Sequence, residues 1–575
     1  MKNILFLLTI VIAKSQAFIK VGNDAQCDFT TIADAKTQAT VLSDFELRIA
    51  TNKTYFENLS FDSVPISLIG GFANCTDAQS NTLSPSKTKI DGSSLFKPVI
   101  VLENINSVAI EISFKNLEIT NGLGNIIAPS GGINIKDVDA QVNFENLYLH
   151  NNSSEKGGAI YSTRFDSTGD LNLIFMKDID IDSNMSIDGG GLYCTESQIY
   201  IYGNSVIQSN QALGPGGGSR DGEGGGIYAT ANCKINFYSG NLNFTQGIVS
   251  NTANGSGGGI YASGAAQIVL DGYQVNNLGI QMGDATNPVN ITNNITNFHD
   301  GAAIYIEGSN TNVTAFASII NFNEAAGSYG GAVAVNNSAS FSLLRKLENC
   351  WDNYLCNQMS ANKVFSSQAF PSYGGAISAQ NLAIVTINQS IIKQNQAEFG
   401  TAIALNNAIL SMQSSMVYKN GQNGNVNNLQ DKSVIYLTNS STASLALSTF
   451  ANNQVTGSVL ENISSNLYVL SSILIDAVDI NQATTVINEM FSCLVTHEQA
   501  SFTGTNINTN AVSFINQTND DYHLQNTSVG TDMCDSSIFL ATTADCDNEI
   551  RITMYNAGAD ETNSFSDLIF KNNFE

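Results

Sequence analysis

Apolar and polar residues alternate in short runs through the middle of the chain, and many of these runs end in asparagine. Examples are Leu147–Asn151, Val206–Asn210, Ile319–Asn323 and Ile391–Asn395. An alternation with period two places the apolar side chains on one face of an extended segment, which is typical of a half-buried strand. Asparagine tolerates the left-handed backbone region. Each run therefore predicts a short strand that ends in a turn.

A pair of glycines followed closely by an aliphatic residue recurs after these runs. The clear copies are Gly157–Ile160, Gly190–Leu192, Gly225–Ile227, Gly258–Ile260, Gly330–Val333 and Gly374–Ile377. Weaker copies are Gly131–Ile133, Gly301–Ile304 and Gly400–Ile403. The copies begin about 34 residues apart on average, a period that is typical of solenoids. Glycine permits a positive φ and a close backbone approach, so each pair predicts a turn between two strands.

The repeat predicts an all-β fold, a single-stranded right-handed parallel β-helix (solenoid) with an N-terminal capping helix. Equivalent residues of successive coils would lie about 4.8 Å apart, so like charges in one column would repel by about 0.9 kcal/mol even in water. The composition agrees, because only 13% of the residues are charged while 71 are asparagine. Stacked asparagines can hydrogen-bond along a column. The alternative, an antiparallel β-sandwich, requires hairpin turns instead of glycine pairs at a solenoid spacing.

Composition and charge exclude several other classes. The formal net charge is -26 and the chain has only five arginines, so we expect no nucleic-acid partner. Hydrophobic residues make up 43% of the chain and are evenly spread, which excludes a disordered protein. A helical bundle would need far more Lys, Glu, Leu and Ala.

The N-terminus resembles a secretory signal. Lys2 supplies the positive start, Ile4–Ile12 the apolar stretch and Ser15–Ala17 a small-residue cleavage site. The alternative is a buried first strand. We predict a signal peptide over residues 1–17, a mature chain without a transmembrane span, and a secreted or outer cell-surface location.

Nine cysteines occur without a CxxC pair and without a histidine at zinc spacing. Disulfides are the natural interpretation in an oxidising compartment. Connectivity does not follow from the sequence, and the pairing that we guess is Cys27–Cys75, Cys194–Cys233, Cys350–Cys356 and Cys534–Cys546. Cys493 would be left over.

The Gly-Gly-Ala-Ile copies resemble the repeats of polymorphic outer-membrane proteins and of the wider pectin-lyase-like β-helix group. Phe29–Ala35 resembles the helix that caps such rods, and Tyr55–Asn58 and Ile66–Phe72 resemble their first coils. Asp521–Leu524 and Gly558–Glu561 follow the order of the choice-of-anchor segment of secreted bacterial β-helix proteins. The resemblance implies a cap and first coil over residues 18–60, a β-helix over 61–515, and an anchor-like segment with a tail over 516–575.

Asp178, Asp180 and Asp182 alternate with Ile179 and Ile181. On a strand the three carboxylates would share one face, about 6.6 to 7 Å apart. They are candidate ligands for Ca²⁺, or, together with Asp188 in the next turn, candidate acid and base residues. The alternative is an outward polar face that binds nothing.

Tyr161, Tyr193, Tyr228, Tyr261 and Tyr305 follow the glycine pairs at one register. If the aliphatic residue before each tyrosine points inward, the tyrosines point outward. An outward column could stack on sugar rings and donate hydroxyl hydrogen bonds. An inward column would be an ordinary aromatic stack in the core.

The sequence therefore favours a secreted or cell-surface β-helix that acts by binding, as an adhesin or glycan-contacting protein. Its partner would be a polysaccharide or the surface of a host or neighbouring cell. The alternative, a polysaccharide lyase or glycoside hydrolase, is implied by the pectin-lyase-like resemblance. The four histidines are scattered, so we find no Ser/His/Asp grouping.

Overall fold

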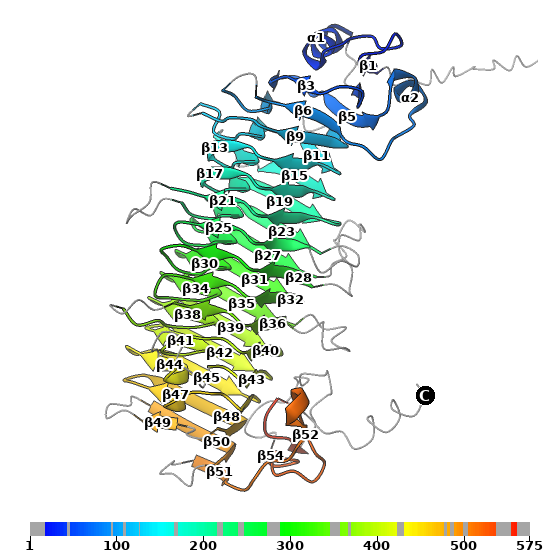
Figure 1. Cartoon of the computed structure of the whole chain (residues 1–575). Helices are drawn as coiled ribbons and strands as arrows, with labels where there is room; N and C mark the ends of the chain where they lie inside the picture. Colours follow the sequence, from blue (N-terminus) through cyan, green and yellow to red (C-terminus); the bar gives the residue numbers. More distant parts are fainter. Residues whose placement is uncertain are drawn as a thin grey trace, which may run out of the picture.

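The chain forms a long rod of stacked coils (Figure 1). The computed structural model describes residues 18–559, apart from 43–45, 94–95, 107–110, 126, 166–170, 215–221, 240–245, 273–287, 346–356, 366–369, 422–430, 477–479, 483–487, 498–503 and 536–553. The predicted signal segment 1–17 and the guessed Cys350–Cys356 pair lie outside these residues. The fold is a right-handed parallel β-helix, as the repeat predicts.

Each coil contributes strands to three parallel sheets, which we call A, B and C. Sheet B has 14 strands among the described residues, and those in the middle of the rod begin directly after the glycine pairs. They are β4 (Leu59–Asp62), β7 (Ile100–Ile105), β10 (Ile133–Val138), β14 (Ile160–Thr163), β18 (Leu192–Thr195), β22 (Ile227–Thr230), β26 (Ile260–Ala262), β30 (Ile304–Glu307), β34 (Val333–Asn336), β38 (Ile377–Gln380), β41 (Ile403–Asn406), β44 (Ser433–Thr438), β47 (Ser458–Asn462) and β49 (Ile480–Gln482).

Sheet A is the largest sheet and is bent, so that each coil crosses it in two limbs. The first limb contains β1 (Ile19–Val21), β2 (Glu46–Ala50), β5 (Ser67–Phe72), β8 (Glu111–Lys115), β11 (Gln141–Glu145), β15 (Asn172–Lys177), β19 (Ser197–Tyr202), β23 (Lys234–Tyr238), β27 (Gln267–Asp271), β31 (Asn312–Phe316), β35 (Ser340–Leu344), β39 (Ile384–Asn388), β42 (Ile409–Gln413), β45 (Thr442–Ala446), β48 (Asn466–Ile475), β50 (Asn488–Thr496) and β51 (Gly504–Asn508).

The second limb of sheet A leads toward sheet C. It contains β3 (Tyr55–Phe56), β6 (Thr88–Asp91), β9 (Leu117–Thr120), β12 (Tyr148–His150), β16 (Asp180–Asp182), β20 (Val206–Gln208), β24 (Gly247–Val249), β28 (Val289–Thr292), β32 (Ser318–Asn321), β36 (Asn357–Ser360), β40 (Ser390–Lys393), β43 (Met416–Tyr418) and β46 (Thr449–Ala451). Sheet C contains β13 (Ser153–Lys156), β17 (Met185–Asp188), β21 (Gln211–Ala212), β25 (Thr252–Ala253), β29 (Ile295–Thr296), β33 (Glu324–Ala325) and β37 (Lys363–Val364).

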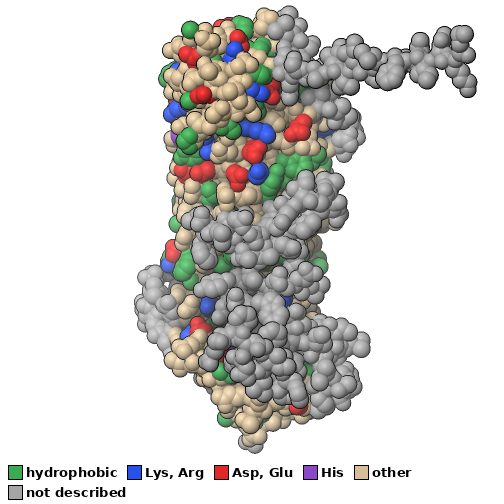
Figure 2. Space-filling view, turned by 90° about the vertical axis from the view of Figure 1, so that its right-hand side faces the viewer, with side chains coloured by type: hydrophobic (Ala, Val, Ile, Leu, Met, Phe, Trp, Pro, Cys, Tyr) green, Lys and Arg blue, Asp and Glu red, His purple; other side chains and the backbone are tan. Residues whose placement is uncertain are grey.

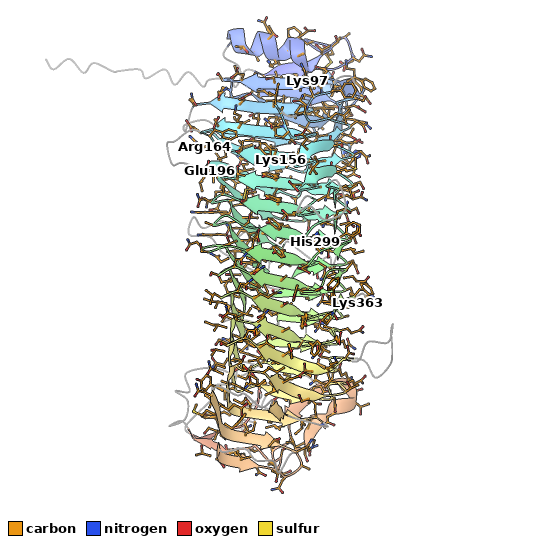
Figure 3. All side chains as sticks on the ribbon, turned by 90° about the vertical axis from the view of Figure 1, so that its left-hand side faces the viewer. Lys97, Lys156, Arg164, Glu196, His299 and Lys363 are labelled. Carbon is orange, nitrogen blue, oxygen red and sulfur yellow. A yellow bond between two sulfur atoms is a disulfide. The ribbon has the colours of Figure 1, made fainter. Side chains whose placement is uncertain are left out.

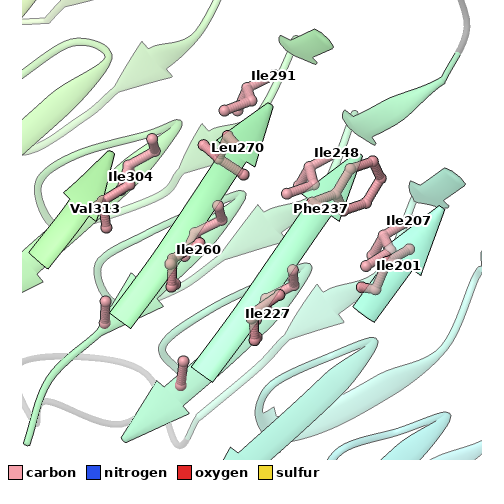
Figure 4. Close-up of a cluster of buried hydrophobic side chains, with 14 of the residues drawn as sticks. Ile201, Ile207, Ile227, Phe237, Ile248, Ile260, Leu270, Ile291, Ile304 and Val313 are labelled. Carbon is pink, nitrogen blue, oxygen red and sulfur yellow. The ribbon is translucent and has the colours of Figure 1, made fainter. Parts of the chain in front are cut away.

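The interior of the rod is one continuous apolar core. Figure 4 shows isoleucine, leucine and phenylalanine side chains from neighbouring coils stacked in it, among them Ile227, Ile260 and Ile304. These three residues are register partners in sheet B and are essentially inaccessible to solvent. Because the coils are in register, the period-two pattern of each strand becomes a column of like side chains along the axis.

A ladder of buried asparagines lies inside the turn between the second limb of sheet A and sheet C. In each step, the backbone N–H and the Nδ2 of one asparagine donate to the Oδ1 of the next at 2.9–3.1 Å. Nδ2 also donates to a backbone carbonyl of the preceding coil, as Asn294 does to Ile248 at 2.9 Å. The members are Asn152, Asn184, Asn210, Asn251, Asn294, Asn323, Asn362, Asn395, Asn420 and Asn453.

The ladder confirms the expected asparagine column and corrects one position in it. Asn210, Asn323 and Asn395 end their runs and belong to the ladder, but Asn151 does not. Asn151 takes the positive-φ turn position (φ 53°), and Asn152 enters the ladder instead. At the other end Asn453 donates to the two carboxylate oxygens of Asp476, at 2.7 and 2.8 Å.

The glycine pairs are needed for two reasons, a positive φ at the first glycine and a close approach of two backbones at the second. Gly157 has a φ of 61°. Gly158 has no such backbone strain, but a Cβ there would lie 2.2 Å from the carbonyl oxygen of Gly190 in the next coil. The backbones of successive coils therefore touch at this turn, and any side chain would push them apart.

The N-terminal end of the rod carries helix α1 (Ile32–Leu42), whose Ile32, Ala35 and Ala39 join the core beside β1 and β2. The N–H groups of Ile32 and Ala33 donate to the Glu57 carboxylate at 3.0 and 2.8 Å, which satisfies the exposed start of the helix. A short helix α2 (Cys75–Ser80) follows β5, with Asn74 as its N-cap. In the residues described, neither helix is long and apolar enough to cross a membrane.

The C-terminal segment folds back onto the side of the last coils. It contains β52 (Phe514–Asn516), the 3₁₀ turn η1 (Gln517–Asn519), β53 (Asp521–Leu524), β54 (Cys534–Asp535) and β55 (Met554–Tyr555). Its apolar residues form a second cluster with the outer face of sheet A, where the rings of Tyr522 and Tyr418 lie 4.6 Å apart.

Three disulfides lie among the described residues. Cys27–Cys75 and Cys194–Cys233 confirm two of the guessed pairs. The Cys534–Cys546 pair is wrong, because Cys534 bonds to Cys493. Cys493 ends up beside Cys534 because the C-terminal segment returns to the rod, a long-range contact that sequence spacing does not reveal.

Replacing a ladder asparagine should destabilise the rod. Asn294→Ala leaves two buried donors of Asn251 and the Ile248 carbonyl without partners, so we expect the free energy of unfolding to fall by about 3 kcal/mol. Chemical denaturation followed by circular dichroism measures this. Asn297→Ala, at an exposed position three residues on, is the control and should change it by less than about 0.5 kcal/mol. Equal midpoints for the two variants would contradict a structural role for the ladder.

The ladder end should accept an amide in place of the carboxylate. In Asp476→Asn, Oδ1 can still accept from Asn453, and the new Nδ2 can donate to the preceding coil as the other ladder amides do. We expect its unfolding free energy to stay within about 0.5 kcal/mol of wild type, and that of Asp476→Ala to fall by about 2 kcal/mol. A large loss in both variants, measured by denaturant melts, would show that the charge itself is needed.

Candidate functional site

The acidic run Asp178–Asp182 crosses the bend between the two limbs of sheet A. Ile179 and Ile181 point into the core, with exposed fractions of 2% and 1%, so Asp180 and Asp182 on β16 point outward as predicted. Asp178 differs from the prediction. It occupies the bend itself with a φ of 56° instead of lying on the strand.

A groove runs along the outside of this bend and has a volume of about 660 Å³. We call it the corner groove. Its positive-φ bend residues include Asn116, Asn146 and Asp178 from three successive coils. The lining residues are Leu83, Lys87, Lys115, Asn116, Glu145, Asn146, Leu147, Asp178, Asp180 and Asn204. Figure 2 views this side of the rod and shows charged side chains gathered on its upper coils.

Opposite charges alternate along the first limb beside the groove. Lys115, Glu145 and Lys177 are register partners, and the two lysines approach the two carboxylate oxygens of Glu145 at 3.0 and 3.1 Å. Burial acts to raise the pKa of Glu145, but the hydrogen bonds from both lysines outweigh it and hold that pKa below its usual range. The three side chains are about 40% exposed, so these ion pairs add little stability and mainly set the local charge.

The floor of the groove is a chain of amides. Lys87 Nζ donates to Asn146 Oδ1 at 2.6 Å, and Asn146 Nδ2 donates to Asn116 Oδ1 at 2.8 Å. Asp178 Oδ1 accepts from the backbone N–H of Asn204 at 2.8 Å. The groove therefore offers neutral donors and acceptors on each of several coils.

Asp180 is half-buried at the groove wall. Burial raises its pKa above the usual aspartate value, and the nearby charge of Asp182 adds to the effect. A hydrogen bond from Gln208, at 3.2 Å, and the charges of Lys87 and His150 oppose the rise without cancelling it. Asp180 therefore holds a proton more readily than an ordinary aspartate does.

Tyr148 and His150 of β12 stand next to Asp182. Their rings stack with centroids 4.2 Å apart. Tyr148 Oη donates to Asp182 Oδ2 at 3.2 Å, and His150 Nε2 lies 3.1 Å from Glu118 Oε1. Burial, followed by the charges of Asp182 and Asp180, raises the pKa of Tyr148 to about 12. These partners come from coils about 30 residues earlier in the chain, so the sequence run does not indicate them.

The predicted four-carboxylate cluster does not form. Asp188 lies on sheet C, where its Oδ1 accepts from the N–H groups of Gly222 and Glu223 at 3.0 and 3.2 Å. The ligand oxygens of Asp178, Asp180 and Asp182 do not converge on one point either. Within the described part of the chain, the acidic or thiol side chains that do converge are Asp24, Cys27 and Cys75, and the two cysteines form a disulfide. Ca²⁺ binding at Asp178, Asp180 and Asp182 stays a prediction, because the described side chains do not show these three carboxylates as one convergent group.

The tyrosine column forms on the outside of sheet B. Tyr161, Tyr193, Tyr228, Tyr261 and Tyr305 are register partners, and the aliphatic residue before each of them lies in the core. Neighbouring rings are 4.6 to 5.4 Å apart. The ring faces thus contact each other, and Tyr193 and Tyr261 are only 7% and 4% exposed. The column takes the outward one of the two directions that the sequence left open, and its stacked ring faces leave no room for a sugar ring between them.

A second aromatic column continues the first toward the C-terminus. In the next three coils, the position that tyrosine occupies in the first column is taken by Ala334, Ser378 and Ala404. In these coils the residue directly before the glycine turn is aromatic instead. The members of this column are Tyr329, Tyr373 and Phe399, with rings 5.3 and 5.4 Å apart. Tyr436 returns to the register of the first column as the partner of Ala404, and its ring lies 4.7 Å from that of Phe399. The sequence signal was an aromatic residue directly before Gly330, Gly374 and Gly400. Figure 3 shows this side of the rod, with Lys156 toward its N-terminal end and Lys363 lower down.

Compared with known proteins, the chain matches no family model and no curated protein. The parallel β-helix is shown by the structure. The resemblance to polymorphic outer-membrane proteins, to the pectin-lyase-like group and to an anchor segment stays a prediction from the motifs.

The tyrosine column should make the protein sensitive to alkali. Burial raises the pKa values of Tyr193, Tyr228 and Tyr261 above the unfolded value near 10. Their contribution to stability is therefore complete below about pH 10 and is lost as the pH rises toward the folded-state pKa values. Absorbance at 295 nm should show fewer tyrosinates near pH 11 in the native protein than in denaturant. Tyr228→Phe keeps the stack and should weaken the loss of stability, whereas identical native and denatured titrations would contradict the buried column.

Proposed function

We propose that this protein is a secreted or cell-surface rod that acts by binding a glycan in its corner groove. The observation that carries the proposal is the chain of groove amides and carboxylates on successive coils, from Asn116 through Asn146 to Asp180. Glycan hydroxyls are both donors and acceptors, and paired amide and carboxylate groups match them. The groove volume lies in the range of ordinary ligand sites.

The extracellular location is supported by the chemistry of the chain. The disulfides Cys27–Cys75, Cys194–Cys233 and Cys493–Cys534 are typical of proteins in oxidising compartments. The signal-like N-terminus agrees with this. In this location the proposed partner is a polysaccharide or the glycan coat of a host or neighbouring cell, which makes the protein an adhesin or glycan-contacting surface protein.

One observation favours an enzyme as the second candidate. A glycoside hydrolase uses two carboxyl groups, one of which is a general acid whose pKa lies above the ordinary value. Asp180 has a raised pKa and Asp182 lies two residues away on the same strand. In that case Asp180 would be the general acid, and a polysaccharide lyase or glycoside hydrolase activity would reside in the same groove.

The binding proposal is tested by removing one groove amide. Glycine can adopt the positive φ of this bend, so Asn146→Gly keeps the backbone and deletes only the amide that links Lys87 to Asn116. We expect the affinity of residues 18–575 for a bound oligosaccharide to fall about tenfold, the effect of losing about 1.4 kcal/mol of hydrogen bonding. An array of neutral and uronate oligosaccharides, followed by calorimetry on the positive ones, measures this.

Asn439→Gly is the matched control. Asn439 has a φ of 53°, close to the 54° of Asn146, and donates its amide to the asparagine of the preceding coil, Asn406, but it lies far from the groove. Equal losses in both variants would remove the groove as the site. New reducing ends or unsaturated products on the same panel, abolished by Asp180→Asn, would replace the binding role by the enzymatic one.

A further inference from the structure

We infer that the corner groove selects an uncharged, extended glycan chain lying along the rod axis and rejects polyuronates. The inference rests on the proposed function and names its ligand class. It comes from how the charged side chains of the groove are paired and from how many coils the groove crosses.

The groove crosses several coils in a straight line. Five lining residues each lie one or two positions before a strand of the second limb, and these strands (β6, β9, β12, β16 and β20) pair consecutively in sheet A. The five residues are Lys87, Asn116, Asn146, Asp178 and Asn204. Four steps between five coils cover about 19 Å. A single sugar would fill only part of this length, so the occupant that fits is a chain of several residues.

The cations at the groove are already neutralised by the protein. A uronate carboxylate would bind most favourably to a lysine. Glu145 lies between Lys115 and Lys177, however, and forms an ion pair with each of them, at 3.0 and 3.1 Å. Lys87 hydrogen-bonds the Asn146 amide and shares the groove with Asp178 and Asp180. A polyuronate would therefore meet at least as many anions as cations.

The rest of the molecule adds to this rejection. The chain carries a formal net charge of -26, so a polyanion approaches against a repulsive field that salt only partly screens. An uncharged chain has no such barrier. It can use the amides of Asn116 and Asn146 and the carboxylates of Asp178 and Asp180 as hydrogen-bond partners for its hydroxyls.

Glu145 is then the specificity-determining residue of the groove, and changing it should shift the selectivity toward polyuronates. Glu145→Gln keeps the shape and releases Lys115 and Lys177 for an incoming carboxylate. Because Glu145 is 36% exposed and its ion pairs contribute little stability, the variant should fold with an unchanged melting temperature. Glu103→Gln is the matched control, since Glu103 pairs with Lys136 at 2.7 Å on sheet B, away from the groove.

The experiment is calorimetry of residues 18–575 with cellohexaose, xylohexaose, mannohexaose and hexagalacturonate. For the wild type we expect at least one neutral hexasaccharide to bind at least tenfold more tightly than hexagalacturonate, with little dependence on salt. Glu145→Gln should bind hexagalacturonate at least fivefold more tightly than wild type, so the ratio of its affinity for the neutral ligand to its affinity for hexagalacturonate should fall at least fivefold. Glu103→Gln should match the wild type for every ligand.

The outcomes separate this inference from the proposed function. Equal or tighter binding of hexagalacturonate by the wild type would overturn the selectivity and leave glycan binding in place. The same holds if Glu145→Gln gains nothing toward hexagalacturonate. If no hexasaccharide binds to the wild type, both the selectivity and the proposed function are overturned.

Discussion

The buried asparagine ladder joins each coil that it crosses to the two neighbouring coils through side-chain amides. Each ladder amide donates to the coil before it and to the coil after it, so Asn294 links the carbonyl of Ile248 to the side chain of Asn323. A buried amide without these partners would cost about 1–3 kcal/mol per lost group. A coil that slipped by one residue would turn its asparagine outward and its polar residues inward. The ladder therefore holds the coils in one register, and register turns a repeated sequence into columns.

The columns determine what the surface can do. Residues about 30 positions apart in the chain become neighbours about 4.8 Å apart, so each column must avoid like charges or alternate them. The first limb of sheet A alternates Lys115, Glu145 and Lys177. The same stacking brings Tyr193 and Tyr228 into parallel contact, with their centroids 4.6 Å apart. The aromatic columns thus use their ring faces for packing within the rod, and the polar bend beside Asn146 is the more open surface.

The corner groove follows from the positive-φ bend that each coil makes between the two limbs of sheet A. Short polar residues tolerate this backbone, and Asn116, Asn146 and Asp178 occupy it in succession. Their amides and carboxylate consequently line one side of the rod. The loop after α2 adds Lys87 from the N-terminal end. A site built in this way is long and shallow, and its chemistry is spread over several coils instead of being concentrated in one loop.

The local structure follows from patterns in the sequence. Period-two runs, turn asparagines and glycine pairs specified the strands, the coil repeat, the inward direction of Ile181 and the outward direction of Asp180. These features depend only on backbone sterics and on burying apolar faces. The tertiary structure decided which residues meet. Loops of variable length separate the coils, so the local pattern does not predict which residues of different coils meet. It therefore indicates neither the ion pairs of Glu145 with Lys115 and Lys177 nor the position of Asp188 on another sheet. The return of the C-terminal segment likewise decided the Cys493–Cys534 pair.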